Sequence, residues 1–209
     1  MDIKVCGLKH QDNIEAVSAL GPGYAGFIFY EPSPRFAGQL PVEAVGDLPA
    51  YITKTAVFVD ESAETINGLL DKYPFDAIQL HGNEPPDFCR IFKDKVIVIK
   101  AFGVDENFDF SLLNAYVNAV DFFLFDTKTT AHGGSGNTFD WNILNYYQLN
   151  VPFFLSGGLS LENLDEIKQI SHPQFYGVDL NSRFETAPGM KDINKLAKAF
   201  DIIKQTTDK

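Results

Sequence analysis

Residues 122–141 read Phe-Phe-Leu-Phe-Asp-Thr-Lys-Thr-Thr-Ala-His-Gly-Gly-Ser-Gly-Asn-Thr-Phe-Asp-Trp, and they contain the pattern on which the predicted architecture rests. Four consecutive apolar residues predict a strand that is buried on both faces, as in a parallel sheet. The strand ends in a carboxylate, Asp126, and a polar, glycine-rich segment follows. Such a backbone can close over an anion and present N–H groups to it. A strand followed by a simple turn is the alternative, and this stretch alone leaves both open.

Seven further apolar runs, rich in Val, Ile and Phe, recur along the chain at roughly even spacing. With residues 122–126 they predict eight strands in 209 residues, or roughly 26 residues per unit, which is close to the length that a strand and a helix need. The other runs are residues 3–6, 26–29, 55–59, 77–80, 96–101, 153–156 and 177–180.

Segments with helical spacing separate these runs. They include residues 13–20, residues 62–73, a segment that opens at the cap-like Ser160, and residues 193–203 near the end of the chain. Alternation of strands and helices predicts a parallel sheet, and eight such units predict a closed (β/α)8 barrel, or TIM barrel. No linker or change of composition interrupts the pattern, so we expect residues 1–209 to form a single domain.

The composition limits which binding partners and which cellular compartment suit the protein. The chain is 45% hydrophobic with a net charge of −11, which argues against nucleic acid and anionic membranes as general partners but leaves a small anionic ligand open. Its first residues form a strand-like run, so we expect no signal peptide, and no apolar run reaches about 18 residues. The two cysteines, Cys6 and Cys89, lie in different contexts. We therefore expect a reduced, cytoplasmic protein without a disulfide.

Chemistry in such a barrel takes place at the carboxyl ends of the strands, and phosphate often binds at the loops after strands seven and eight. The residues at the predicted strand ends that can take part in chemistry follow from the sequence. They are Cys6, Arg35, Asp60, His81, Asp126, Ser156, Gly157, Gly158, Asp179, Asn181, Ser182 and Arg183.

Cys6 and Asp126 form the candidate acid–base pair. Cys6 is the last residue of its predicted strand and faces the barrel mouth. A thiol acts as a base near neutral pH if a nearby cation or helix N-terminus stabilises its thiolate. Asp126 would supply the acid, which gives an acid and a base without a metal. The alternative for Cys6 is a packed core thiol, which is the usual state of a free cysteine.

Two other features indicate binding of anionic groups. Gly157 and Gly158 lie between the seventh strand and the segment that opens at Ser160, where a flexible backbone and a helix N-terminus suit phosphate. A tight turn is the alternative. Arg35 follows Pro32 and Pro34, and its planar guanidinium suits a bidentate grip on a carboxylate, with a solvated surface arginine as the alternative.

Metal binding is less well supported by the sequence. The four histidines, His10, His81, His132 and His172, show no pairing at helical spacing and no Cys-x-x-Cys motif accompanies them. His81 at a strand end is the one to watch, and a hydrogen-bonded structural role suits it best. We therefore predict no metal site.

Motifs along the whole chain resemble those of the phosphoribosylanthranilate isomerase family of tryptophan biosynthesis. Each motif is weak by itself, but their joint order and spacing is highly specific. They are residues 4–8, residues 26–29 with 33–35, residues 57–60, residues 79–84, residues 126–127 with 133–136 and 138–141, residues 157–159, residues 177–179 and residues 188–192.

This resemblance implies an Amadori rearrangement of a phosphosugar substrate without a cofactor. It implies that Asp126 protonates the ribose ring oxygen and that Cys6 removes the C2′ proton from the resulting iminium. Arg35 would hold the anthranilate carboxylate, and Asp179 would help to orient the amine or the sugar hydroxyls. The phosphate would bind among the loops after strands six to eight, at Gly134, Ser135, Gly157, Gly158, Asn181, Ser182 and Arg183. We expect a monomer or a homodimer.

The sequence departs from the family pattern at two places. After the eighth strand the family usually has Ser-Ser-Gly-Val-Glu, whereas this chain has Asn181-Ser182-Arg183-Phe184-Glu185. The sixth loop usually carries a Lys where this chain has Asn137. Both departures concern the predicted phosphate contacts and leave the predicted reaction unchanged.

Three other functions fit the sequence less well. A bifunctional sugar isomerase that also serves histidine synthesis is expected to carry an Asp at the end of strand one, where this chain has Cys6. A pentose-phosphate epimerase needs metal-binding His and Asp at its strand ends, and that pattern is incomplete here. A non-catalytic ligand-binding barrel is disfavoured because all the candidate catalytic positions are filled.

Overall fold

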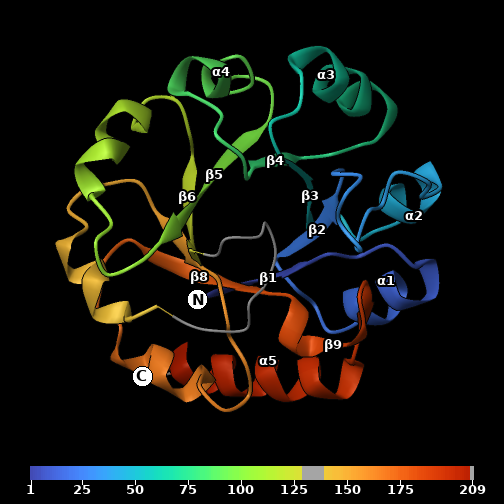
Figure 1. Ribbon diagram of the computed structural model, residues 1–209. Helices are drawn as coiled ribbons and strands as arrows, with labels where there is room; N and C mark the ends of the chain where they lie inside the picture. The colour runs from blue at the N-terminus through green and yellow to red at the C-terminus, as the bar shows by residue number, and fades with distance from the viewer. Residues whose placement is uncertain (129–138, 208–209) are drawn as a thin grey trace.

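The computed structural model describes residues 1–128 and 139–207, and these residues contain the predicted barrel. Within them, eight parallel strands pair in chain order and β1 also pairs with β8, which closes the sheet. Figure 1 looks along the barrel axis and shows this ring of strands inside a ring of helices. The strands are β1 (Asp2–Cys6), β2 (Tyr24–Ile28), β3 (Thr53–Phe58), β4 (Ala77–Leu80), β5 (Ile97–Val104), β6 (Phe122–Thr127), β7 (Phe153–Leu155) and β8 (Phe175–Leu180).

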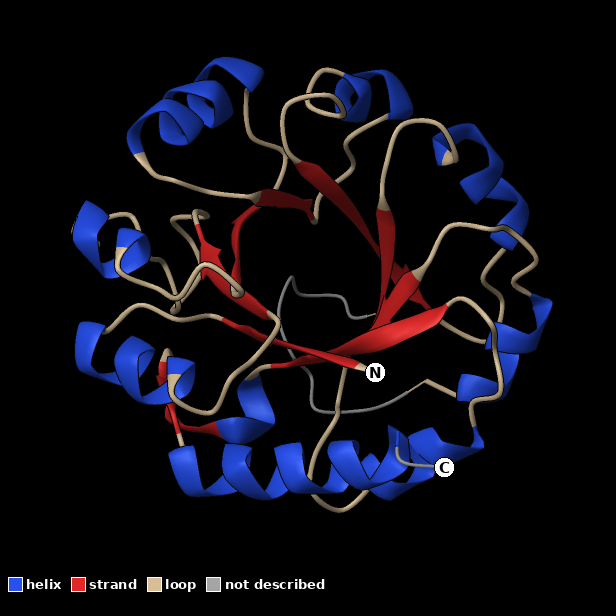
Figure 2. Cartoon of the chain, turned by 180° about the vertical axis from the view of Figure 1, so that it is seen from behind, coloured by secondary structure: helices blue, strands red, loops and turns tan. Residues whose placement is uncertain are grey.

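The outer layer mixes α-helices with short 3-10 helices. The α-helices are α1 (Gln11–Ser18), α2 (Val42–Gly46), α3 (Ala63–Lys72), α4 (Pro86–Arg90) and α5 (Ile193–Thr207). The 3-10 helices are η1 (Phe110–Tyr116), η2 (Trp141–Tyr146), η3 (Leu164–Gln169) and η4 (Ser182–Phe184), and the view from behind shows the helices around the strands (Figure 2). Among the described residues, none of these helices has the length and apolar character that crossing a membrane requires.

Local sequence signals explain where several elements begin. The Ser62 side chain accepts a hydrogen bond from the Thr65 N–H at 3.1 Å and so caps α3, as the predicted helix over 62–73 requires. All eight predicted strands are present, with ends that differ from the predicted ones by a few residues. The TIM-barrel prediction is therefore confirmed.

The core has an outer and an inner part. The outer part fills the space between strands and helices with side chains such as Val5, Phe27, Phe58 and Phe153. The inner part lies inside the barrel near the amino ends of the strands, where Tyr24, Leu124 and Phe154 pack together. Apolar residues on both faces of each strand explain the continuous hydrophobic runs in the sequence.

Aromatic rings close the amino-terminal end of the barrel. We call this group the aromatic plug and define it as Tyr24, Phe122, Phe154 and Tyr176. The ring centroids lie 5.1 Å apart for Tyr24 and Phe154, and 4.8 Å apart for Phe122 and Tyr176. The plug leaves the carboxyl ends of the strands as the place where a ligand can enter.

Candidate active site

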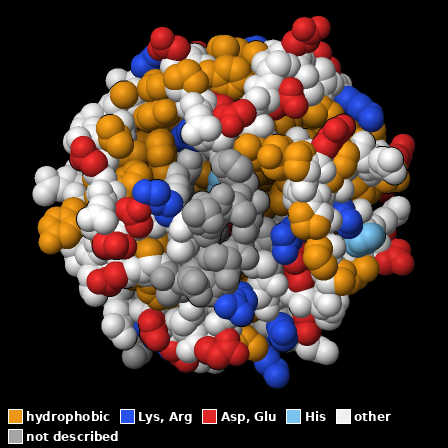
Figure 3. Space-filling view, in the orientation of Figure 1, with side chains coloured by type: hydrophobic (Ala, Val, Ile, Leu, Met, Phe, Trp, Pro, Cys, Tyr) orange, Lys and Arg blue, Asp and Glu red, His pale blue; other side chains and the backbone are white. Residues whose placement is uncertain are grey.

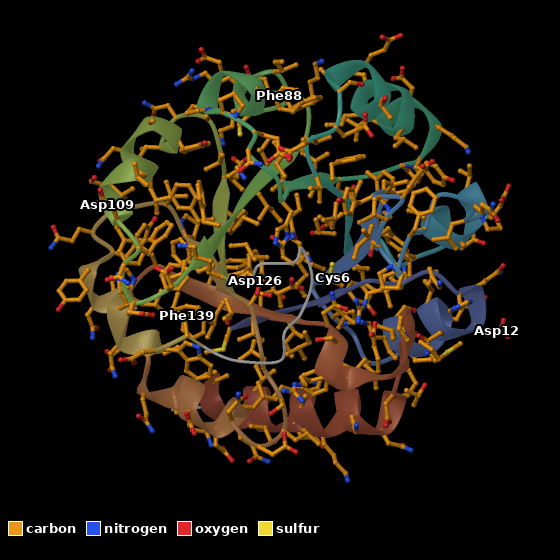
Figure 4. All side chains as sticks on the ribbon, viewed as in Figure 1. Cys6, Asp12, Phe88, Asp109, Asp126 and Phe139 are labelled. Carbon is orange, nitrogen blue, oxygen red and sulfur yellow. The ribbon has the colours of Figure 1, made fainter. Side chains whose placement is uncertain are left out.

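A cavity of about 220 Å³ lies at the carboxyl ends of the strands and brings most of the predicted site residues together. The labelled Cys6 and Asp126 lie near the barrel axis, whereas Asp12, Phe88 and Asp109 lie on the outer ring (Figure 4). The predicted residues that line the cavity are Cys6, Arg35, Asp126, Gly157, Gly158, Asp179, Asn181 and Ser182. Gly134 and Ser135, and also Asn137, lie outside the described residues.

Cys6 is held at the end of β1 beside a buried ion pair. Its side chain is almost completely buried, and Lys4 lies two residues earlier on the same strand. The Lys4 Nζ lies 3.0 Å from Asp179 Oδ1 on the neighbouring β8. A Cβ on Gly26 of β2 would lie 2.8 Å from the Cys6 sulfur, so this glycine makes room for the thiol.

The electrostatic environment acts on the thiol in opposite directions. Burial raises the pKa of Cys6 above its ordinary value, while the Lys4 and Lys191 ammonium groups pull it down. Burial acts to lower the pKa of Lys4, but the Asp179 carboxylate and Cys6 together raise it above its ordinary value. Lys4 is therefore protonated at neutral pH and provides the nearby cation that a thiolate needs.

Asp126 ends β6 within a chain of polar contacts. Its Oδ1 accepts a hydrogen bond from the Thr127 N–H at 2.8 Å, and its Oδ2 lies 3.5 Å from His81 Nε2. The Gln79 side-chain amide nitrogen contacts the other ring nitrogen of His81 at 2.9 Å. If this amide donates, the imidazole proton lies on Nε2, which faces the Asp126 carboxylate. His81 therefore lies between Gln79 and the candidate acid.

Arg35 lines the cavity, but a carboxylate of the protein already holds part of its guanidinium. Nε donates to both Glu185 oxygens at 3.0 Å, and Nη2 donates to Oε2 at 2.7 Å. Lys191 Nζ also lies 2.7 Å from Glu185 Oε1 and 2.8 Å from Asn181 Oδ1. The fork that the sequence analysis assigned to a substrate carboxylate is thus partly occupied by Glu185.

The turn after β7 adopts a backbone that only glycine adopts readily. Gly157 and Gly158 have φ angles of +84° and +67°, in the left-handed region. A Cβ on Gly157 would lie 2.4 Å from the Thr127 backbone nitrogen and 2.6 Å from Asp126 Oδ1. This turn therefore packs directly against the end of β6 and the candidate acid.

The predicted helix that opens at Ser160 is wrong in its start and type. Asn163 Oδ1 accepts a bond from the Ser160 N–H at 2.9 Å, and its Nδ2 donates to the Gly158 carbonyl at 3.0 Å. These bonds fold residues 160–163 into turns, and the six-residue 3-10 helix η3 begins only at Leu164. A full helix N-terminus does not stand behind the glycine turn.

The residues after β8 divide into two groups. Asn181 and Ser182 line the cavity, whereas Arg183 on η4 is exposed and is not among the lining residues. Glu185 continues from η4 into the short antiparallel pair β9 (Glu185–Ala187) and β10 (Met190–Lys191). The change from the family pattern at Arg183 therefore falls beside the cavity and not within its lining.

Sequence reasoning assigned no role to three charged residues near the site. Lys4, Glu185 and Lys191 are paired around Cys6 and Arg35. Lys4 gave a signal that could have been used, because a charge between Ile3 and Val5 interrupts an otherwise apolar buried strand. Glu185 and Lys191 gave no such signal, because Glu185 joins Lys191 on β10 to Arg35 in the distant loop after β2.

A thiol on β1 and a carboxylate on β6 face one cavity of a parallel barrel, and side chains of these types can act as a base and an acid in a barrel enzyme. The comparisons with known proteins narrow this class. A family model described as N-(5′-phosphoribosyl)anthranilate (PRA) isomerase matches residues 3–202. The N-(5′-phosphoribosyl)anthranilate isomerase of Parabacteroides distasonis is 44% identical over 94% of this chain and 90% of its own length.

Solved structures agree with the family model. Phosphoribosyl anthranilate isomerase from Thermotoga maritima has a TM-score of 0.82 and 32% identity, covering 98% of this chain and 99% of its own. A phosphoribosyl anthranilate isomerase in complex with reduced 1-(o-carboxyphenylamino)-1-deoxyribulose 5-phosphate has a TM-score of 0.78 and 28% identity, with coverage of 98% and 99%. The chain belongs to the phosphoribosylanthranilate isomerase family. The resemblance read from its motifs is confirmed.

Proposed function

We propose that this protein converts N-(5′-phosphoribosyl)anthranilate to 1-(2-carboxyphenylamino)-1-deoxyribulose 5-phosphate. The observation that carries the proposal is the pair Cys6 and Asp126, which reach one cavity from β1 and β6. A relative of the same family binds a reduced form of this product, as its structure describes. The reaction is an aldose–ketose isomerisation within tryptophan biosynthesis.

The proposed reaction needs one proton donated and one removed. Asp126 protonates the ribose ring oxygen, the C1′–O bond breaks, and the anilino nitrogen supplies the electron pair that forms a C1′ iminium. The Cys6 thiolate then removes the C2′ proton, and the C2′–H electrons form an enolamine as the iminium nitrogen becomes neutral. Tautomerisation of the enolamine gives the ketone. The iminium itself acidifies the C2′ proton, so these steps use only side chains.

Anion recognition in this proposal is shared between side chains and backbone. Arg35 presents its remaining guanidinium edge to the anthranilate carboxylate while Glu185 holds Nε and Nη2 in place. The phosphate binds along the backbone of Gly157 and Gly158 and near Asn181 and Ser182, which line the same cavity. Asp179 supports the site through its contact with Lys4.

The test is a fluorescence assay of the purified protein. Phosphoribosylanthranilate is generated in the cuvette from anthranilate, and conversion is followed as loss of the anthranilate fluorescence. We expect turnover that depends on protein concentration and needs no added metal or cofactor. Turnover at the uncatalysed rate would overturn the proposal. The corresponding sugar substrate of histidine synthesis, offered in parallel, distinguishes a bifunctional isomerase.

A further inference from the structure

Lys4 is a buried charge to which the proposed reaction assigns no proton transfer and no substrate contact. Its side chain has 0% exposure, and its strand neighbours Ile3 and Val5 point into the apolar core. Desolvating an ammonium group is unfavourable, and a buried ion pair is often no more stabilising than the apolar residues that could replace it. The presence of Lys4 inside the barrel therefore points to a role other than stability.

The position of Lys4 places its cation beside the candidate base. Residues two apart on a strand point to the same face, so Lys4 and Cys6 both face the barrel interior. A Cβ on Gly26 would lie 2.8 Å from the Cys6 sulfur and 3.1 Å from Lys4 Nζ. One glycine thus leaves the space that the sulfur and the ammonium group share. Asp179 Oδ1, at 3.0 Å, holds the ammonium group in this space.

Charged groups face Cys6 from several elements. Lys4 comes from β1, Asp179 from β8 and Lys191 from β10, and Arg35, His81 and Asp126 line the same cavity. Burial raises the pKa of the thiol most, and Lys4 is the strongest group acting to lower it. Lys191 also acts to lower it, and Asp179 acts to raise it.

We propose that Lys4 is a positioning residue for the base: Asp179 holds its ammonium group against the Cys6 sulfur, where the cation stabilises the reactive thiolate. Lys4 acts through Cys6 and does not touch the substrate. The inference rests on the proposed role of Cys6 as the base. It assigns Asp179 the role of holding Lys4, in addition to any contact that Asp179 makes with the substrate.

The experiment titrates the thiol directly, without substrate. Thiolate absorbance in the ultraviolet is measured against pH, and the spectrum of a matched Cys6→Ser chain is subtracted to remove Cys89 and the tyrosines. Loss of one neighbouring opposite charge shifts a pKa by roughly one to three units. We therefore expect Lys4→Met to move the Cys6 titration to higher pH by about one unit or more.

Asp179, the other partner of the ion pair, gives a second variant that should shift the Cys6 titration in the opposite direction. Asp179→Asn removes the negative charge but keeps an amide oxygen that accepts from the Lys4 ammonium group, so the cation stays beside the thiol and the Cys6 titration should move to lower pH. The double variant should titrate above the wild type, because Lys4 acts on the thiol more strongly than Asp179 does. General loosening of the barrel would move both single variants in the same direction, which would overturn the proposal.

Lys54→Met is the matched control for loss of a buried lysine. Lys54 is also buried in a barrel strand, and its Nζ lies 2.9 Å from Asp76 Oδ2, near the amino end of β3. Its removal should leave the Cys6 titration unchanged. A wild-type titration in Lys4→Met overturns the proposal. If Lys4→Met does not fold, a shift of Asp179→Asn to higher pH, or no shift, overturns it.

The pH profile of kcat/KM separates this inference from the proposed function. The rising limb of the profile should move with the thiol titration in Lys4→Met and Asp179→Asn. If the thiol pKa moves while the limb stays in place, the coupling between Lys4 and Cys6 stands and the role of Cys6 as the base fails. If neither moves, the inference about Lys4 fails while the loss of activity in Cys6→Ser can still support the reaction.

Discussion

The backbone at Gly157 packs directly against Asp126, the candidate acid. The φ of +84° at Gly157 disfavours any other residue, and an added Cβ would meet the Thr127 backbone nitrogen and Asp126 Oδ1. We predict that Gly157→Ala lowers both the free energy of unfolding and kcat, because the clash falls on the candidate acid. Denaturant unfolding and the fluorescence assay measure the two effects.

Gly21→Ala is the matched control for this substitution. Gly21 also has a positive φ, +74°, but a Cβ there would meet no atom within 4 Å. The free energy of unfolding of Gly21→Ala should fall only by the roughly 1–2 kcal/mol that a left-handed backbone costs a residue with a side chain, and kcat should stay unchanged. Equal losses of kcat in both variants would mean that backbone conformation, and not the contact with Asp126, sets the effect.

The acid–base pair gives the sharpest prediction for single residues. Cys6→Ser and Asp126→Asn are nearly isosteric, so each should fold normally. Each should lower kcat by roughly 10² or more, which is the scale of losing one proton-transfer group. Circular dichroism checks the fold and the fluorescence assay measures kcat. A kcat within a few-fold of the wild type would remove that residue from the mechanism.

At the scale of elements, Glu185 fastens the β9–β10 pair to the loop that carries Arg35. Its side chain is 4% exposed and contacts both Arg35 and Lys191. Burial acts to raise the pKa of Glu185, but the two cations outweigh it and hold the pKa below its ordinary value. Removing one partner of a buried ion pair typically destabilises by about 3–5 kcal/mol. We predict a loss toward this size at neutral pH for Glu185→Gln.

The pH dependence of this loss has a definite sign. A carboxyl whose folded pKa is depressed contributes stability above its unfolded pKa of about 4.3 and loses it as the pH falls through the folded value. The difference between wild type and Glu185→Gln should therefore be full near neutral pH and shrink below about pH 4. Urea unfolding across this range measures it, with Asp165→Asn, from an exposed pair, as the control. A difference that does not vary with pH would exclude the charge of Glu185 as its cause.

Elements with a local signal were predictable, and those set by distant contacts were not. The run at 122–126 and the cap at Ser62 predict β6 and α3, because burial and capping act within a few residues. The segment after Ser160 looks like an α-helix, yet Asn163 bonds to Ser160 and Gly158 and delays η3 to Leu164. Competition of an Asn side chain with helical hydrogen bonds is the physical reason.

The site shows the same division between local and distant causes. Cys6 and Asp126 could be placed at the mouth because the carboxyl ends of parallel strands meet at one end of a barrel. The ion pair between Glu185 and Arg35 joins residues 150 positions apart, so no spacing in the sequence predicts it. Which edge of a guanidinium is open to a ligand depends on such a contact.

At the scale of the whole molecule, the charge of the protein opposes that of its proposed substrate. The net charge is −11, whereas the substrate carries a phosphate and a carboxylate. Figure 3 shows Lys and Arg side chains interspersed with Asp and Glu on this face. Cationic side chains at the mouth, such as Arg35 in the cavity lining and Arg183 beside it, attract anions locally, and salt screens this attraction.

We therefore predict that kcat/KM falls as ionic strength rises, and that Arg183→Gly makes this dependence shallower. Arg183 is exposed beside the cavity and not in its lining, so it should act on association more than on kcat. Lys72→Gln, on the last residue of α3, is the control and should keep the wild-type slope. If Arg183→Gly leaves KM and its salt dependence untouched, Arg183 does not contribute to the attraction of the substrate.

The aromatic plug closes the barrel at the amino ends of its strands. In the part of the chain that the structure describes, this end is filled by Tyr24, Phe122, Phe154 and Tyr176. Substrate entry and product release therefore both use the carboxyl ends of the strands. Substrate cannot enter at one end while product leaves at the other, so product must be released before the next substrate molecule binds. Added product should therefore raise the apparent KM and leave the maximal rate unchanged, which initial rates at several product concentrations will show.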